Sequence, residues 1–285
     1  MKKWIKVIIA VVIFIVFARA LLVLSGLETS DGLTEPSIAV MDISGQIFDS
    51  HTVIETLKKL KNNPLVEGVI IRVDSPGGAV TPSMEIYDYV LNLGKPVYAA
   101  MGSVAASGGY LISLGADAIY AEPSTITGSI GVIMNLVNTQ ELMDKIGVKS
   151  VVLKSGAYKD AGSPARQMTE QDKQVLNDVL MDMYYQFTDI VIQRRGMPKD
   201  KVMALADGRI YTGRMAQKES LVNHIGSWRK AAEDMKDKLN KPALEIYEVP
   251  APKTMLEKLT ETSSKSELGR ILSTKTGFFY LAEIY

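Results

Sequence analysis

Short apolar runs alternate with helix-like stretches through the middle of the chain, and this alternation most limits the folds open to it. Apolar runs of strand length occupy residues 38–43, 68–73, 97–101, 118–121 and 150–153. Helical periodicity appears at 53–60 and 84–93, and most strongly at 171–193, where Thr169 and Asp172 have the spacing of an acidic capping box. Strands that alternate with helices are typical of a parallel sheet. The sequence therefore predicts an α/β fold with a largely parallel sheet.

Residues 1–24 have the pattern of a membrane anchor. Lys2, Lys3 and Lys6 come first, and residues 4–24 are mostly apolar and would measure about 31 Å as a helix, close to the hydrocarbon core of a bilayer. Lysines on the amino-terminal side place that end in the cytoplasm, so the rest of the chain faces outward as a single-pass protein of the cell membrane. A cleaved signal peptide and a buried core helix are the alternatives.

The rest of the chain divides by composition into three parts. Residues 25–36 are short, polar and acidic and form a predicted linker. Residues 37–242 carry the alternating pattern and form the predicted main domain. Residues 243–285 turn polar and are treated as a C-terminal extension of unassigned role.

Composition excludes several classes of protein. Lys+Arg and Asp+Glu both number 32, and this zero net charge argues against nucleic acid as a partner. The absence of cysteine excludes disulfides, thiolate catalysis and cysteine zinc sites. The chain has only two histidines, His51 and His224, which are the rival candidates for a general base, and Asp74 is a carboxylate that could orient one. No metal, nucleotide or dinucleotide motif is present, so we expect no metal and no cofactor.

Three segments are candidates for chemistry. Segment 72–78 (RVDSPGG) ends in glycines, whose bare backbone N–H groups can stabilise an oxyanion. Segment 101–110 (MGSVAASGGY) places Ser107 between a strand and a helix, beside small residues only. Segment 154–166 (KSGAYKDAGSPAR) is a predicted loop with Lys159 in its middle. Taken singly, each has a plainer explanation: a Pro-Gly turn, close helix–strand packing and a solvated lysine.

A lysine can accept the proton of a serine hydroxyl only if the lysine amine is uncharged. A free lysine has a pKa of about 10.4, and burial lowers such a value by ~3–5 units. The amine must therefore be sheltered from water and held by hydrogen bonds. Ser129, in segment 127–132 (TGSIGV), is a candidate partner for it, because a hydroxyl adds no charge.

In combination and order, these segments resemble the bacterial signal peptide peptidase A (SppA) family. The resemblance spans roughly residues 37–237. It is carried by segments 74–78 (DSPGG), 102–110 (GSVAASGGY), 127–132 (TGSIGV), 154–160 (KSGAYKD) and 206–213 (ADGRIYTG). It implies a Clp protease/crotonase-like fold of repeated β-β-α units, preceded by one N-terminal transmembrane helix.

The activity that the resemblance implies is that of a membrane-anchored serine endopeptidase with a Ser-Lys dyad. Its substrates would be remnant signal peptides and other short or unfolded peptides. By position, Ser107 matches the nucleophile, Lys159 the general base and Ser129 the serine that orients the lysine. Gly78 and the N–H of Gly108 match the oxyanion hole.

Long members of that family fuse two such units and combine the lysine of one half with the serine of the other. This chain has one unit. We therefore expect a homo-oligomer with active sites shared between subunits, each joining Ser107 of one copy to Lys159 of its neighbour.

Other functions remain open at this point. One is a related membrane protease that cleaves stomatin-like partners, which a single protein substrate would favour. Another is a crotonase-type acyl-CoA enzyme, because that fold also directs glycine N–H groups at an oxyanion. A third is a catalytically inactive scaffold, which the presence of Ser107 and Lys159 disfavours.

Overall fold

The computed structural model describes residues 33–250. The predicted membrane anchor, most of the predicted linker and most of the C-terminal extension lie outside these residues. Within residues 33–250, no helix combines the length and the apolar character that crossing a membrane requires.

An eight-stranded sheet forms the centre of the described part of the chain, in the order β6-β5-β3-β2-β1-β8, with β4 beside β3 and β7 beside β4. Only β5 and β6 pair antiparallel. The strands are β1 (Ser37–Ser44), β2 (Val66–Ser75), β3 (Val97–Ala106), β4 (Ala118–Ala121), β5 (Ile126–Gly128), β6 (Ile210–Thr212), β7 (His224–Ile225) and β8 (Glu245–Glu248). The predicted α/β fold with a largely parallel sheet is confirmed. β8 lies past residue 242 and continues the sheet beside β1.

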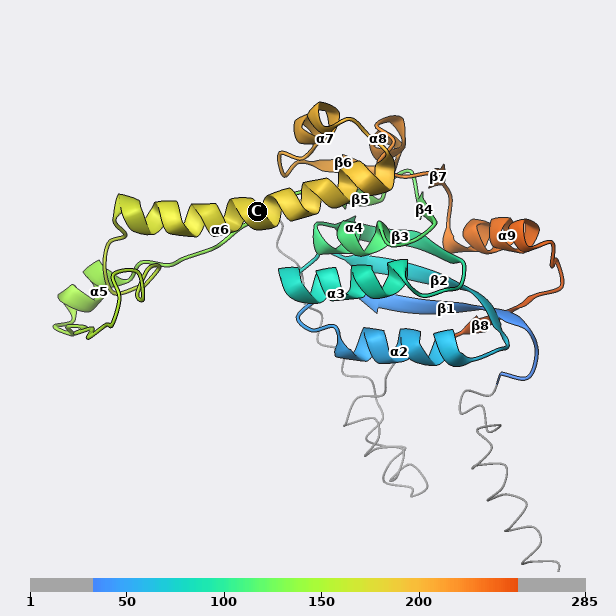
Figure 1. Ribbon diagram of the computed structural model, residues 1–285, viewed down its shortest axis with the longest axis horizontal. Coiled ribbons are helices and arrows are strands. Elements are labelled where there is room, and N and C mark those ends of the chain that lie inside the picture. The colour runs from blue at the N-terminus through green and yellow to red at the C-terminus, as the bar shows by residue number, and fades with distance from the viewer. Residues whose placement is uncertain (1–32, 251–285) are drawn as a thin grey trace, which may run out of the picture. The chain divides into compact units, whose positions relative to one another are not determined.

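Helices cover both faces of this sheet (Figure 1). They are α2 (His51–Asn62), α3 (Val80–Leu91), α4 (Gly108–Ser113), α5 (Gln140–Lys145), α6 (Glu170–Arg195), α7 (Lys199–Leu205), α8 (Gly213–Lys218) and α9 (Trp228–Leu239). Side chains alternate along β1: Ala39 and Met41 join the larger core cluster, which includes residues of α2, α3 and α4, whereas Ile38 and Val40 join the cluster that includes α9. The sheet is therefore buried on both sides, as parallel strands require.

The predicted helices at 53–60, 84–93 and 171–193 correspond to α2, α3 and α6. The start of α6 is the predicted capping box. The Asp172 N–H donates to the Thr169 hydroxyl at 3.1 Å, and the Thr169 N–H donates to the Asp172 carboxylate at 3.0 Å. The box satisfies two donors that the first turn of a helix leaves without partners.

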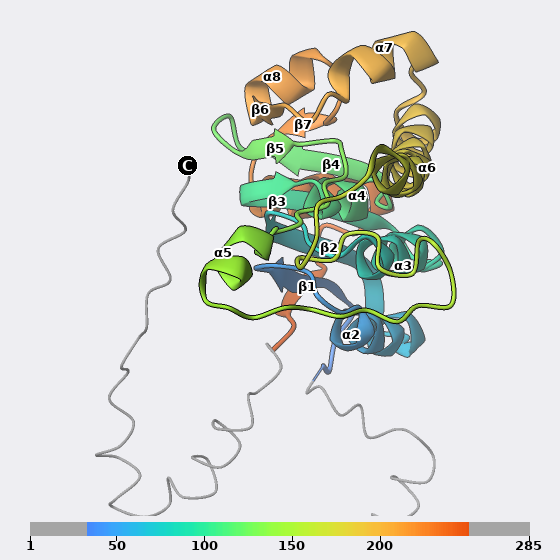
Figure 2. The same cartoon turned by 90° about the vertical axis from the view of Figure 1, so that its left-hand side faces the viewer.

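Residues 132–169, which we call the arm and which include α5, extend away from the sheet together with the first half of α6 (Figures 1 and 2). None of residues 131–171 is buried. In α6 the buried apolar side chains, Phe187 and Val191, lie in its second half, which packs on the body of the protein. The arm thus contributes almost nothing to the core.

The strand predicted at residues 150–153 does not form. Val151 and Leu153 are 84 % and 95 % exposed, and no neighbouring strand pairs with them in residues 33–250. The prediction was wrong because an apolar run becomes a strand only where a partner supplies hydrogen bonds, and here the run lies on the arm.

Candidate active site

Ser107 lies at the turn from β3 into α4. Its backbone has φ 53° and ψ −118°, a conformation that side-chain-bearing residues rarely adopt and that folds keep mainly at functional sites. The turn is held from both sides, since the Ser107 N–H donates to Gly128 O at 2.8 Å and the Leu111 N–H donates to Ser107 O at 2.9 Å. β3 ends in buried alanines and every residue of α4 is buried, so the fold fixes Ser107 while leaving it half-buried.

Two backbone N–H groups lie beside this serine. Ile47 donates to Gly77 O at 3.0 Å and accepts from the Ala79 N–H at 2.8 Å, so the N–H of Gly78 between them points away from this pairing. Gly108 is the first residue of α4, and its N–H therefore has no acceptor within the helix. Gly78, Ser107 and Gly108 line the same small cavity of about 30 Å³. Two such donors beside a hydroxyl are the arrangement that stabilises an oxyanion.

Close backbone contacts explain the glycines at this point. A Cβ on Gly78 would lie 2.1 Å from Ile47 O, and a Cβ on Gly77 would lie 2.6 Å from the nitrogen of Gly108. Gly77 also has φ +97°, in the left-handed region. Only glycine lets the 76–78 turn approach the first residue of α4 this closely.

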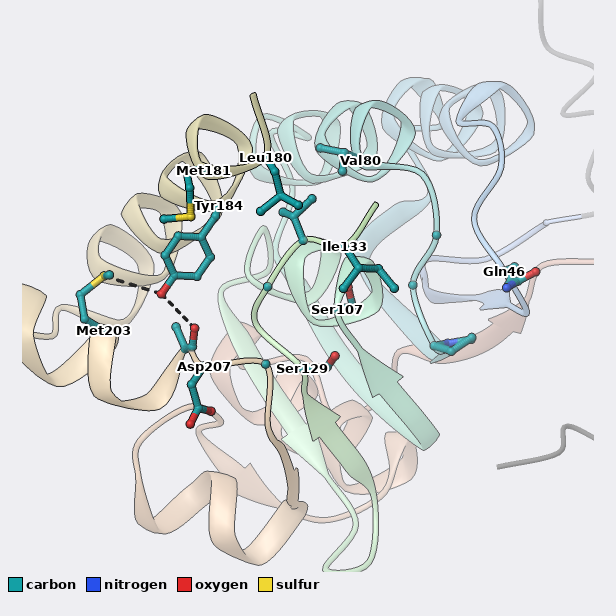
Figure 3. Close-up of a pocket in the computed structure, with 17 residues that line it drawn as sticks. Gln46, Val80, Ser107, Ser129, Ile133, Leu180, Met181, Tyr184, Met203 and Asp207 are labelled. Atoms are coloured by element: carbon teal, nitrogen blue, oxygen red, sulfur yellow. Dashed lines mark hydrogen bonds between the residues drawn. The ribbon is translucent and has the colours of Figure 1, made fainter. Parts of the chain in front are cut away.

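Ser129 follows β5 and opens onto the same site. It too has a positive φ, 48°, and its N–H donates to Arg209 O at 2.8 Å. The preceding carbonyl, Gly128 O, accepts the N–H of Ser107, so one hydrogen bond links the two serine-bearing turns. Both serines line a cavity of about 740 Å³, and Figure 3 shows them on neighbouring segments of its floor.

The cavity walls come from elements that the sequence analysis did not assign to the site. Leu180, Met181 and Tyr184 of α6 and Met203 of α7 form one side (Figure 3). The Tyr184 hydroxyl donates to Ala206 O at 2.9 Å, and burial raises the pKa of this phenol. The sequence periodicity predicts an apolar face on α6 that includes Met183 and Phe187, and these two residues line the small cavity. The periodicity did not single out the residues of the large cavity wall, and it did not say what the face covers.

One carboxylate, Asp207, lines the large cavity. Hydrogen bonds from Arg209, which approaches Asp207 Oδ1 at 2.7 Å, lower the pKa of Asp207 to about 2. Its charge is therefore present at neutral pH but paired. The small cavity beneath Ser107 is mainly apolar, with Val80, Met84 and Phe187 in its walls.

Lys159 lies elsewhere in the chain, on the arm. It is exposed, and its backbone N–H donates to Gly156 O at 3.2 Å. No residue between Ile133 and Leu180 lines the large cavity, so only the first residues of the arm contribute to it. A single chain thus brings together Ser107, Ser129, Gly78 and Gly108, but not Lys159.

The other titratable candidates lie away from both cavities. His51 begins α2 and His224, in β7, stacks on Tyr120 with ring centroids 4.7 Å apart. Asp74 accepts the Val104 N–H at 2.9 Å and so holds β3 rather than a histidine. Among residues 33–250, no three His, Cys, Asp or Glu side chains cluster as a metal site would need.

Comparison with known proteins places the chain in a family. The model of peptidase family S49 matches residues 90–241, and that of Clp protease matches residues 33–126, which agrees with the mixed α/β sheet. A protein of Enterococcus faecium named "Putative signal peptide peptidase SppA" is 37 % identical over 72 % of this chain and 64 % of its own length.

Two further relatives extend the comparison. A Synechocystis protein named "Putative protease slr0021" is 34 % identical over 81 % of this chain and 86 % of its own length. "Serine protease SPPA, chloroplastic" of Arabidopsis thaliana is 31 % identical over 79 % of this chain but 34 % of its own length. The match thus covers just under two thirds of the Enterococcus protein and about a third of the Arabidopsis one. The chain belongs to peptidase family S49, a family of serine proteases.

Proposed function

We propose that this protein is a serine endopeptidase that uses Ser107 as nucleophile and Lys159 as general base. The observation that carries the proposal is the strained turn at Ser107, where Gly78 and Gly108 line the same cavity as the serine. A hydroxyl next to two such donors suits acyl transfer from a peptide carbonyl.

The reaction then proceeds in two halves. The Ser107 oxygen attacks the peptide carbonyl carbon while its proton passes to the uncharged amine of Lys159, and the amides of Gly78 and Gly108 stabilise the oxyanion. The C–N bond breaks, and the leaving amine takes the proton from Lys159. A water molecule next attacks the acyl-enzyme, and Lys159 accepts its proton and returns it to Ser107.

The base comes from a neighbouring copy of the chain in this proposal, within a homo-oligomer. The position of Lys159 on an arm that leaves the body of its own chain supports this assignment. So do the apolar side chains that the arm exposes, among them Ile133, Val137 and Leu153 at 81 %, 73 % and 95 %. Burial of such side chains in a subunit interface would shelter the amine from water. Ser129, on the cavity floor, would then hold the amine with its hydroxyl.

The proposed substrates are remnant signal peptides and other short or unfolded peptides, cut outside the cytoplasmic membrane by a chain anchored through residues 1–24. The apolar cavity lining around Met181 and Met203 and below Ser107 supports apolar segments as substrates. Cleavage of one stomatin-like partner is the alternative, and a crotonase-type acyl-CoA activity is a more distant one.

Mass spectrometry of a synthetic signal peptide digested by the full-length chain in detergent tests this function. We expect defined cuts in the apolar region with the wild type, and none with Ser107→Ala or Lys159→Ala, because the two residues act as one unit. Ser103→Ala is the matched control: Ser103 is exposed on the same strand and lines neither cavity, so this variant should cut as the wild type does.

Other results of this experiment would favour a different base, substrate or class of enzyme. Continued cleavage by Lys159→Ala would return the general base to His51 or His224. Cleavage of a single protein but of no signal peptide would favour the stomatin-like alternative. Acyl-CoA binding without peptide cleavage would favour the crotonase-type enzyme.

A further inference from the structure

The loop that carries Lys159 is held by charges, because no apolar core supports it. Asp160, the next residue, accepts from Arg166 Nε at 2.9 Å and Nη2 at 2.8 Å, and from Lys154 Nζ at 2.7 Å. Arg166 Nη1 also donates to Asp172 at 2.5 Å, in the first turn of α6. The two carboxylates are well shielded, with side chains 11 % and 4 % exposed. We call these four residues the charge cluster.

The charge cluster contains two cations and two anions, so its net charge is zero. Hydrogen bonds from Arg166 hold the pKa of both Asp160 and Asp172 well below the usual range, so both carboxylates stay ionised at neutral pH. The α-carbon of Asp160 lies about 3.8 Å from that of Lys159 along the chain. An unbalanced carboxylate at this place would favour the protonated form of a neighbouring amine.

We propose that Arg166 and Lys154 are positioning residues for Lys159, which balance the charge of Asp160 so that the lysine can lose its proton. This inference rests on the proposed role of Lys159 as base. Arg166 has a second effect, because its bridge from Asp160 to Asp172 ties the lysine loop to the start of α6.

Three further charged or titratable groups of the arm are Tyr158, Asp144 and Lys149. Tyr158 precedes Lys159 and is half exposed. On the α5 side, Asp144 and Lys149 line a separate cavity of about 230 Å³ with Ala165, and they have opposite charges. The charged or titratable groups on the segment of Lys159 are therefore Lys154, Tyr158, Asp160 and Arg166. Asp172 of α6 joins them through Arg166, and Asp144 and Lys149 line the separate cavity on the α5 side.

The test is the pH dependence of kcat/KM for peptide cleavage by the full-length chain. Arg166→Gln gives the cluster a net negative charge, which favours the protonated form of Lys159. The acid limb, where kcat/KM rises with pH as the base loses its proton, should therefore move up by about one pH unit. On that limb kcat/KM should be about tenfold lower than in the wild type, and it should recover at high pH. Asp160→Asn gives a net positive charge, so the limb should move the opposite way. The double variant restores neutrality and should restore the wild-type limb.

Controls separate charge from folding. Lys173→Gln removes a cation from the same end of α6, where Lys173 pairs with the exposed Glu170 at 2.6 Å, and should leave the limb in place. Lys154→Gln makes the same charge change as Arg166→Gln without touching Asp172, and it supplies the test if Arg166→Gln does not fold. An acid limb that stays in place in all three single-charge variants of the cluster, whatever their rates, overturns the inference and leaves the Ser-Lys proposal intact. Wild-type cleavage by Lys159→Ala overturns both.

Discussion

Gly77 shows how closely single residues control this site. Its backbone passes so near the start of α4 that an added Cβ would lie 2.6 Å from Gly108 N and 2.9 Å from the Ser107 Cβ. The same contact places Gly78 and Gly108 on one small cavity with the serine. The geometry of the proposed oxyanion hole thus depends on a residue that donates no hydrogen bond to it.

We expect Gly77→Ala to lower kcat for peptide cleavage by about 10²-fold or more, because displacing one oxyanion donor has an effect of this size. Gly94→Ala is the matched control. Gly94 also has a positive φ, +79°, but a Cβ there would meet nothing within 4 Å, so this variant carries backbone strain without a clash. Steady-state kinetics of the two variants makes the comparison, and equal kcat values would show that the contact at Gly77 has no catalytic role.

At the scale of elements, the arm and the first turn of α6 differ from the rest of the protein in what stabilises them. The sheet and its helices have large apolar clusters, whereas residues 131–171 bury no side chain. The capping box and the ion pairs of Arg166 take the place of a core there. Stability of the arm should therefore depend on pH in a way that stability of the sheet does not.

The two carboxylates of the charge cluster determine how the stability of the arm changes with pH. Asp160 and Asp172 have lowered pKa values in the folded protein, so their full contribution to the stability of the arm is present above the ordinary carboxyl value of 3.8. It is lost progressively as the pH falls from that value through their lower folded-state pKa values. Hydrogen exchange should show full protection of residues 160–173 from pH 7 to about pH 4, and a loss of protection below, while β2 stays protected. Asp160→Asn should lose part of this protection already at pH 7. Unchanged protection of the arm at pH 3 would contradict the expectation.

At the scale of the whole molecule, the main fact is that one chain holds the candidate nucleophile and the candidate base apart. The first turn of α6 carries Asp172, and Tyr184 in the cavity wall lies twelve residues further along the same helix. That separation is about 18 Å at 1.5 Å per residue, longer than a lysine side chain. A site shared between copies is the arrangement that would join the two groups.

Mixed oligomers test this sharing. Ser107→Ala and Lys159→Ala, each inactive alone, should recover about a quarter of wild-type activity when co-expressed in equal amounts, because a random ring gives one site in four with both groups intact. The control pairs Ser107→Ala with the Ser107→Ala/Lys159→Ala double variant and should remain inactive. Co-assembly without any recovered activity would place both groups in one chain.

The sequence by itself determined the local features. The spacing of apolar residues predicted β1, β2, β4 and α2, and the spacing of Thr169 and Asp172 predicted the start of α6. The small residues around Ser107 indicated a tight strand-to-helix turn. These features depend on contacts within a few residues, and a pattern of neighbouring residue types is enough to specify them.

Only the tertiary structure decided which distant segments meet. The contact of Gly77 with Gly108, the hydrogen bond from Ser107 to Gly128 and the wall that Tyr184 adds to the cavity all join residues far apart in sequence. The apolar run at 150–153 fits a strand as well as β4 does, yet it lies exposed on the arm without a partner in the described part of the chain. The periodicity of apolar residues indicates that one face of an element is apolar. Which surface covers that face depends on the packing of the whole chain and of any neighbouring copy.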